Sequence, residues 1–217
     1  MQYSAEYFTS NNYGIDPKRA LMYAQERARI QELKPMGGAI LDIGCGIGDF
    51  LDGFGCEWRK YGTDISQYAR TEAIKRGVFI LESIYEVVGS FDVVVFRGTI
   101  QHLPDPFEQI AHASLLLKPG GLMVFLATPD ADSICYRLFG DLPALDPALN
   151  YWIPSQRTLT NVLTNLGMVV THTLHPYRET AYAQPVQDVW RFVMRLFGRK
   201  SKFAFPGNMM EVYAIKP

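Results

Sequence analysis

Apolar residues recur at helical spacing in residues 17–33, and then in short runs separated by amphipathic segments. Asp16 before Pro17 is typical of a helix start, because aspartate caps free amides and proline fits the first helical turn. Short apolar runs bounded by turn-forming residues predict strands at 39–43, 60–64, 78–81, 91–96 and 121–127. Helices are predicted between them at 49–54, 67–76 and 106–117.

The pattern is less regular after residue 128. A helix at 155–166, a strand at 168–174, a helix at 186–197 and a last strand at 209–215 are predicted, with irregular segments at 129–153 and 175–208. Strands rich in β-branched and aromatic residues that alternate with helices indicate a parallel sheet covered on both faces. We therefore expect one domain over residues 1–217. Its fold would be three-layer, doubly wound α/β, with a mostly parallel seven-stranded sheet and insertions after strands 5 and 6.

Composition and charge exclude several classes of protein. Hydrophobic residues make up 48% of the 217 residues, enough for a packed core, which excludes an intrinsically disordered chain. The formal net charge of −1 argues against a nucleic-acid partner. The three cysteines form no Cys-x-x-Cys pair, and no leader-like or membrane-spanning run is seen, so we expect a cytoplasmic protein without a metal site. A monomer and a homodimer both stay open.

The motif with the most chemical content is Leu41-Asp42-Ile43-Gly44-Cys45-Gly46-Ile47-Gly48-Asp49, where the first strand should turn into a helix. Its glycines allow positive φ and close approach of a ligand, and the helix start presents free amides to that ligand. Asp49 stands where a dinucleotide fingerprint needs a small residue, and no Gly-Lys-Ser/Thr follows as in a P-loop. An acid-x-Gly-x-Gly-x-Gly ligand loop and a tight glycine-rich turn remain as interpretations.

Asp64 ends the second predicted strand, 22 positions after Asp42. An acid about 20 residues beyond such a loop can accept hydrogen bonds from both ribose hydroxyls; alternatively, Asp64 caps the following helix. Two further motifs lie at 91–106, where the fourth strand leads to a helix start, and at 117–122, the turn into the fifth strand. In this order the four motifs resemble the class I S-adenosylmethionine-dependent methyltransferases, with most similarity to the ubiquinone-biosynthesis and sugar O-methyltransferase group.

The resemblance implies S-adenosylmethionine as cofactor and a Rossmann-like methyltransferase fold. Asp42 and the 44–48 loop would hold the methionine portion, Asp64 the ribose, residues 82–84 the adenine and residues 97–99 the sulfonium region. The N-terminal segment 1–35 would cover the cofactor through early aromatic residues, which are Tyr3, Tyr7, Phe8 and Tyr13. The implied cofactor-binding residues are Tyr13, Asp42, Gly44, Cys45, Gly46, Gly48, Asp64, Ile65, Glu82, Ser83, Ile84, Arg97, Gly98 and Thr99.

The resemblance also implies an enzyme that methylates a small molecule, most simply at a hydroxyl oxygen of a sugar, phenol or quinol. A hydroxyl acceptor must lose its proton, and histidine is the natural base near neutral pH. His102, after the fourth strand, is the candidate catalytic residue, although it could instead only fix the turn into Leu103, and His175 is the alternative base. N- or C-methylation and a catalytically silent cofactor-binding subunit stay open.

Acceptor specificity is expected in the segments 129–153 and 175–208. Their aromatic residues either line an apolar acceptor site or form a small separate core; they are Tyr136, Phe139, Tyr151, Trp152, Tyr177 and Tyr182. The helix at 186–197 combines an apolar stripe with basic residues that continue to Lys202. Three interpretations are open: a lid packed on the sheet or a second subunit, contact of residues 186–202 with an anionic membrane surface, and binding of an anionic substrate.

Overall fold

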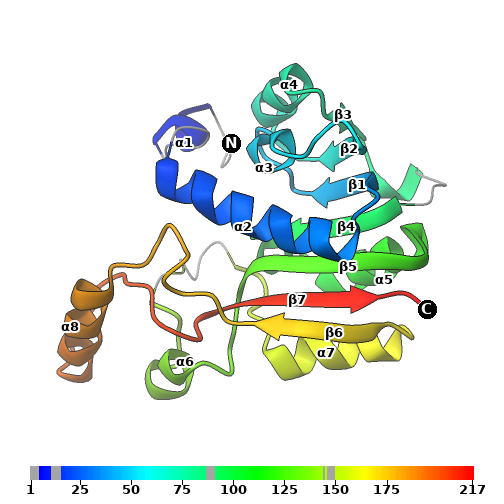
Figure 1. Cartoon of the computed structure of the whole chain (residues 1–217). Coiled ribbons are helices and arrows are strands. Elements are labelled where there is room, and N and C mark those ends of the chain that lie inside the picture. Colours follow the sequence, from blue (N-terminus) through cyan, green and yellow to red (C-terminus); the bar gives the residue numbers. More distant parts are fainter. Residues whose placement is uncertain (1–4, 11–15, 87–90, 144, 146–149) are drawn as a thin grey trace.

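The computed structural model describes residues 5–10, 16–86, 91–143, 145 and 150–217 (Figure 1). Its strands are β1 (Gly38–Ile43), β2 (Trp58–Thr63), β3 (Phe79–Ile80), β4 (Phe91–Arg97), β5 (Leu117–Pro129), β6 (Val169–Leu174) and β7 (Met209–Ile215). Its α-helices are α1 (Ala5–Ser10), α2 (Pro17–Leu33), α3 (Asp49–Asp52), α4 (Gln67–Lys75), α5 (Pro106–Leu116), α6 (Ile134–Phe139), α7 (Gln156–Asn165) and α8 (Pro185–Leu196). Short 3-10 helices are η1 (Ile84–Glu86) and η2 (Ile100–His102).

The seven strands form one sheet in the order β3-β2-β1-β4-β5-β7-β6. The first five strands of this order run parallel, and β7 is antiparallel to both β5 and β6. The expected mostly parallel, seven-stranded α/β sheet is therefore confirmed. Because the chain leaves β1 toward β2 on one side and returns through β4 on the other, the strand order reverses between β1 and β4. Ligands of open α/β sheets bind beyond the carboxyl ends of the strands at such a point.

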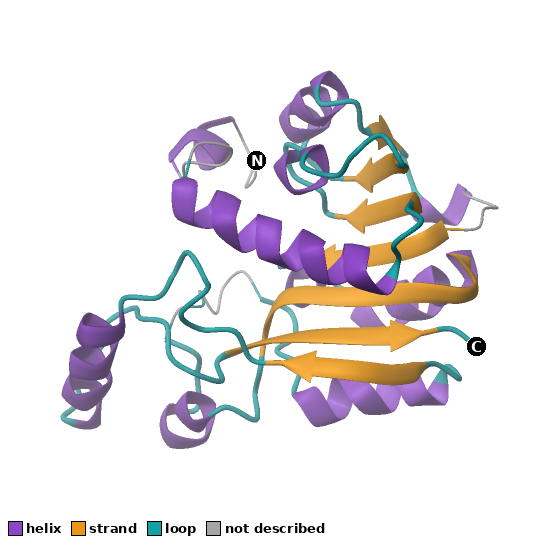
Figure 2. Cartoon of the chain, in the orientation of Figure 1, coloured by secondary structure: helices purple, strands orange, loops and turns teal. Residues whose placement is uncertain are grey.

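Helices cover both faces of the sheet, as Figure 2 shows. On β4, Val93 and Val95 pack against α2, α3 and α4, while Val94 and Phe96 pack against α5 and α7. Side chains alternate between the faces of a strand, so this apolar run fills two separate core layers. The same alternation directs Arg97, the next odd-numbered residue, to the α2 face.

Most predicted elements differ from the observed ones by only a few residues at their ends. The predicted helix at 49–54 ends at Asp52, and the predicted strand at 78–81 is reduced to Phe79–Ile80. Two helices of six residues, α1 and α6, were not predicted. Helix α6 nevertheless begins and ends at typical capping residues. The Ser133 side chain accepts from the Tyr136 amide at its start, and Gly140 ends it with a φ of +68°.

Gly48 lies between β1 and α3 and packs tightly against α4. Its φ is +78°, and a Cβ placed on it would lie 3.1 Å from both Cα and Cβ of Ala73. Gly77, just after α4, has a similar φ of +76°, but no atom of the described residues lies within 4 Å of the corresponding Cβ position. The two glycines therefore share the same backbone conformation and differ in their packing.

We predict that Gly48→Ala destabilises the chain more than Gly77→Ala. Both alanines carry left-handed strain of about 1–2 kcal/mol, and the alanine at position 48 adds an overpacking cost of about 1–3 kcal/mol. Urea denaturation of both variants measures the difference in the free energy of unfolding. Equal losses would show that the approach to Ala73 does not constrain position 48.

Candidate functional site

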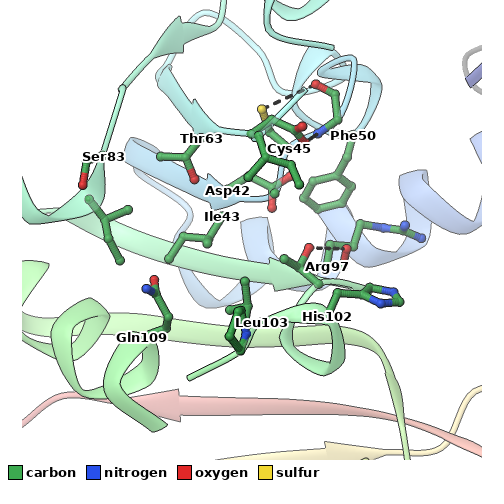
Figure 3. A pocket seen from close by; sticks show the side chains of 18 of the residues that line it. Asp42, Ile43, Cys45, Phe50, Thr63, Ser83, Arg97, His102, Leu103 and Gln109 are labelled. Carbon is green, nitrogen blue, oxygen red and sulfur yellow. Dashed lines mark hydrogen bonds between the residues drawn. The ribbon is translucent and has the colours of Figure 1, made fainter. Parts of the chain in front are cut away.

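A cavity of about 580 Å³ opens at the carboxyl ends of β1, β2 and β4, at the point where the strand order reverses (Figure 3). Its volume is typical of small-molecule sites. The predicted site residues that line it are Asp42, Gly44, Cys45, Gly46, Asp64, Ile65, Glu82, Ser83, Ile84, Arg97, Gly98, Thr99 and His102. Gly48 is not among its lining residues, because it is packed against α4 instead, and Tyr13 lies outside the described residues.

The glycine bend after β1 is tied to the end of β2. The backbone amides of Gly44 and Cys45 both donate to the Thr63 carbonyl, at 2.8 and 2.9 Å. The Gly46 amide donates to Asp64 Oδ2 at 2.9 Å. These bonds hold the bend open toward the cavity. Among the described residues, a Cβ at Gly46 would meet only the edge of the Phe8 ring, at 3.5 Å.

Asp64 joins the bend to the start of α4. Its Oδ1 accepts from the Ser66 amide at 2.8 Å, and Ser66, rather than Asp64, is the residue that caps α4. Burial raises the pKa of Asp64, although the hydrogen bonds from Ser66 and Gly46 oppose this shift. An ionised carboxylate has about four acceptor positions, so Asp64 keeps acceptor capacity on the cavity wall.

Two carboxyl groups on the α2 face of the cavity have oxygen atoms without a hydrogen-bond partner in the described part of the chain. They are Asp42, which is 1% exposed, and Asp49. Burial, together with the nearby Asp64 and Asp49 carboxyls, raises the pKa of Asp42 to about 8, against the opposing effect of Arg97. Burial also raises the pKa of Asp49. A ligand with a positive charge or hydrogen-bond donors would provide partners for these carboxyl oxygen atoms.

Arg97 balances these carboxyl groups from the end of β4. Its guanidinium donates to Glu26 of α2 through Nε at 2.7 Å and Nη2 at 3.2 Å, and lies 4.0 Å from the centre of the Tyr23 ring. The attraction of Glu26 outweighs burial and raises the pKa of Arg97. Arg97 is therefore held on the α2 side of the cavity, and its effect on a ligand there is mainly electrostatic.

The end of the cavity beside β3 is formed by residues 82–85. The Glu82 side chain is 75% exposed and pairs with Arg70 of α4 at 2.7 Å, whereas Ile84 is buried in the core. Ser83 Oγ accepts from the Tyr85 amide. Among the residues predicted for this region, Glu82 and Ser83 therefore have polar groups near the cavity, and Ile84 contributes an apolar wall.

His102 lies on η2, and its side chain extends in the same direction as that of Arg97 in Figure 3. Its Nε2 is 3.3 Å from the side-chain amide nitrogen of Gln101, and that nitrogen also donates to the Gly98 carbonyl at 3.1 Å. Because that amide nitrogen can only donate, Nε2 of His102 is the acceptor in this arrangement. His175, the alternative base, is bonded to Asp130 at 3.0 Å and does not line the cavity.

Several cavity residues were missed or left undecided by the sequence. Tyr23, Asp49 and Phe50 line the cavity although they had not been assigned to it. Tyr23 and Phe50 are apolar-face residues of α2 and α3 and gave no ligand signal, whereas Asp49 ends the glycine motif and could have been assigned from it. Of the six aromatic candidates for the acceptor site, Tyr151 alone lines the cavity. Tyr136 and Phe139 instead pack in a small separate core around α6.

Comparison with known proteins agrees with this fold and site. A family described as a methyltransferase domain matches residues 15–173. The ubiquinone biosynthesis O-methyltransferase of Colwellia psychrerythraea is 35% identical over 128 residues, which cover 51% of this chain and 52% of that protein. The enzyme of the same name from Xanthomonas axonopodis pv. citri is 32% identical over 138 residues, covering 58% and 55%. The chain thus spans about half the length of the curated relatives that it matches.

Solved structures show the same fold. A SAM-dependent methyltransferase from Thermotoga maritima, described as a possible histamine N-methyltransferase, has a TM-score of 0.65 at 21% identity, covering 100% of both chains. Magnesium protoporphyrin IX methyltransferase from Synechocystis with bound SAM has a TM-score of 0.63 at 13% identity, covering 100% of this chain and 93% of that one. The fold is thus that of the class I S-adenosylmethionine-dependent methyltransferases. The chain belongs to the methyltransferase-domain family, which confirms the predicted family.

We predict that the stability of the ligand-free chain depends on pH through Asp42. The folded chain keeps the Asp42 proton up to a pH of about 8, whereas the unfolded chain releases it above 3.8. Asp42 therefore contributes stability at low pH that is lost as the pH rises through this window, by at most about 1.4 kcal/mol per pH unit. Asp42→Asn does not titrate, so its stability relative to wild type should rise over the same window and then level off.

Urea denaturation between about pH 5 and 9 measures this difference. Asp92→Asn is the matched control. Although burial alone would raise the pKa of Asp92, the hydrogen bonds from Lys118 and Ala39 hold it below its ordinary value, so this difference should stay flat. A flat difference for Asp42→Asn as well would contradict the raised pKa.

Proposed function

We propose that this chain transfers the methyl group of S-adenosylmethionine to a hydroxyl oxygen of a small acceptor. The proposal rests on a buried oxygen of Asp42 that has no hydrogen-bond partner among the described residues. It lies beside an open glycine bend, and Asp64 lines the same cavity. The cofactor combines an ammonium and a sulfonium group with two ribose hydroxyls. The positive charges would interact with the carboxyl group of Asp42, and the ribose hydroxyls would donate hydrogen bonds to Asp64.

Each part of the cavity then has a role. Asp42 and Asp49 would hold the cationic amino-acid end, with Gly46 leaving room for it, and Asp64 would accept from the ribose hydroxyls. Residues 82–84 would border the adenine. Tyr7 and Phe8 of α1, which line the cavity above the bend, would exclude water from this end.

The bound cofactor supplies an already activated methyl group, so the protein mainly has to align the acceptor and exclude water. A hydroxyl acceptor also has to lose its proton. In our proposal Nε2 of His102, the unprotonated ring nitrogen, takes that proton once the acceptor hydroxyl has displaced the Gln101 side-chain amide from it. The acceptor would lie between His102 and Tyr151, whose side chain lines the cavity and is 73% exposed.

Oxygen as the acceptor atom is supported by the relatives named ubiquinone biosynthesis O-methyltransferase. The exposed ring of Tyr151, which lines the same cavity as Leu103 and Pro104, suits a ring-shaped acceptor such as a phenol or quinol. Methylation of nitrogen or carbon is the alternative, and it would make a proton acceptor at position 102 unnecessary.

We predict that Asp42→Asn and Asp64→Asn each weaken binding of S-adenosylhomocysteine by at least about tenfold, because a charge-assisted hydrogen bond contributes on the order of 1.5–3 kcal/mol. Isothermal titration calorimetry measures the affinity. Asp92→Asn, at the opposite end of β4, is the matched control and should bind like wild type. Wild-type affinity in both test variants, or binding of NAD in place of the nucleoside, would overturn the assigned cofactor site.

We predict that His102→Asn lowers kcat about 10²–10⁴-fold with a phenol or quinol acceptor, while the affinity for S-adenosylhomocysteine stays within about twofold. His175→Asn, which removes the histidine bonded to Asp130 outside the cavity, should leave kcat unchanged. Steady-state kinetics after a screen of hydroxylated sugars, phenols and quinols gives the comparison. Full turnover by His102→Asn would favour an acceptor that needs no base.

A further inference from the structure

Helix α8 turns its apolar stripe toward solvent. Trp190 is 59% exposed and Val186 is 86% exposed, although both belong to the stripe that the sequence predicts. The exposed apolar residues of this surface, which we call the α8 stripe, are Val186, Val189, Trp190, Val193, Leu196 and Phe197. A cluster of this size on a single helix indicates an interaction surface rather than scattered apolar residues.

The rotation of α8 is fixed by contacts on its opposite side. Asp188 is fully buried and accepts from the Gln184 amide at 2.7 Å and from the Tyr177 hydroxyl at 2.9 Å. Arg195 donates to Asp141 at 2.6 Å. These polar contacts face the protein, so the helix is amphipathic in the inverse sense: its polar side is packed inward and its apolar side is exposed.

An aromatic contact secures the same orientation. The Phe192 ring stacks on Phe205, with ring centroids 4.4 Å apart, and meets the Phe139 ring of α6 edge-on at 5.6 Å. Phe192 thus anchors α8 to the small core around α6. Burying the α8 stripe inside the same chain would break these aromatic contacts and leave Asp188 without its partners.

The positive charge beside the α8 stripe comes from the basic residues that follow the helix, because Arg191 and Arg195 pair with Asp188 and Asp141 on its inward side. Residues 186–202 contain five basic residues, and Asp188, which is buried, is their one acid. The basic residues that follow the helix are exposed, and they are Arg199, Lys200 and Lys202. This concentration stands out in a chain with a formal net charge of −1. It fits an anionic partner, and it opposes the pairing of two copies through this surface, because like charges would meet.

We propose that α8 docks on the surface of an anionic phospholipid bilayer, with the α8 stripe in the boundary between headgroups and acyl chains and the basic residues at the headgroups. Trp190 is of the residue type that favours this boundary. The twelve residues of α8 extend about 18 Å, which suits a helix lying in the plane of the surface. No helix in the described ranges is long and apolar enough to cross a bilayer.

The position of α8 brings this surface to the side of the molecule where the cavity opens. In Figure 1, α8 lies beyond the ends toward which the arrows of β1 and β2 point, and the cavity is formed at those same strand ends. Docking would therefore hold the cavity side of the protein near the bilayer. This inference goes beyond the proposed function and does not depend on it.

Cosedimentation with phospholipid vesicles tests the proposal. We expect the full chain to bind vesicles of phosphatidylcholine mixed with phosphatidylglycerol at least about tenfold more tightly than vesicles of phosphatidylcholine alone. Val189→Gln with Val193→Gln should weaken binding at least about tenfold, as should joint replacement of Arg199, Lys200 and Lys202 by glutamine. Leu115→Gln, at an exposed apolar position of α5, is the matched control and should bind like wild type.

Fluorescence gives a second, independent measurement. Trp58 is buried, Trp152 packs against the main core, and Trp190 is exposed on α8. Vesicles with phosphatidylglycerol should therefore shift the tryptophan emission of the wild type to the blue, and Trp190→Phe should lose the shift while still binding. Thermal denaturation of each variant establishes that it is folded.

Three results would overturn the proposal: no binding to the mixed vesicles by the folded wild type, equal binding to both vesicle types, or binding that survives the changes in the α8 stripe. A concentration-dependent dimer that Val189→Gln with Val193→Gln dissociates, without vesicle binding, would assign the surface to a second copy. None of these results depends on methyl transfer. Failure of docking and failure of the cofactor site are therefore distinguishable.

Discussion

The buried guanidinium of Arg97 is the interaction on which the site depends. It forms a bidentate ion pair with Glu26 and stacks on the Tyr23 ring. It also interacts electrostatically with the carboxyl groups of Asp42 and Asp49. Breaking a buried ion pair by removing one partner costs about 3–5 kcal/mol in proteins, because the remaining charge is left uncompensated. The contact therefore joins α2 to the end of β4 and sets the electrostatic conditions of the cavity at the same time.

This balance is incomplete in a way that suits a cationic ligand. Arg97 is paired with Glu26, and within the described ranges the two aspartates keep oxygen atoms that have no hydrogen-bond partner. Burial raises the pKa of both aspartates in the absence of a ligand. A bound ammonium or sulfonium would favour the ionised carboxylates instead, which couples binding to proton release. The same carboxyl groups thus destabilise the ligand-free site and stabilise the occupied one.

Much of the site could be predicted because its signals are local. Gly44 and Gly46 lie in a short motif at the end of a strand, and Asp64 directly follows the neighbouring strand, so parallel pairing brings them together. Tyr23 and Glu26 could not be assigned in this way. They are ordinary members of an amphipathic helix, and only the packing of α2 across β4 places them on Arg97. Gly48 belongs to the same motif, yet its packing on Ala73 turns it away from the cavity.

The sequence by itself determined the succession of the seven strands and of six of the helices, the glycine bend and the acids at the strand ends, because these follow from periodicity and from local backbone chemistry. It also determined that α8 has an apolar stripe with basic residues nearby. Only the tertiary structure decided which way that stripe faces. The rotation of a helix is set by its contacts with distant residues, here Asp141, Phe205 and Tyr177, and these bury the polar side of α8 and leave the apolar side to a partner.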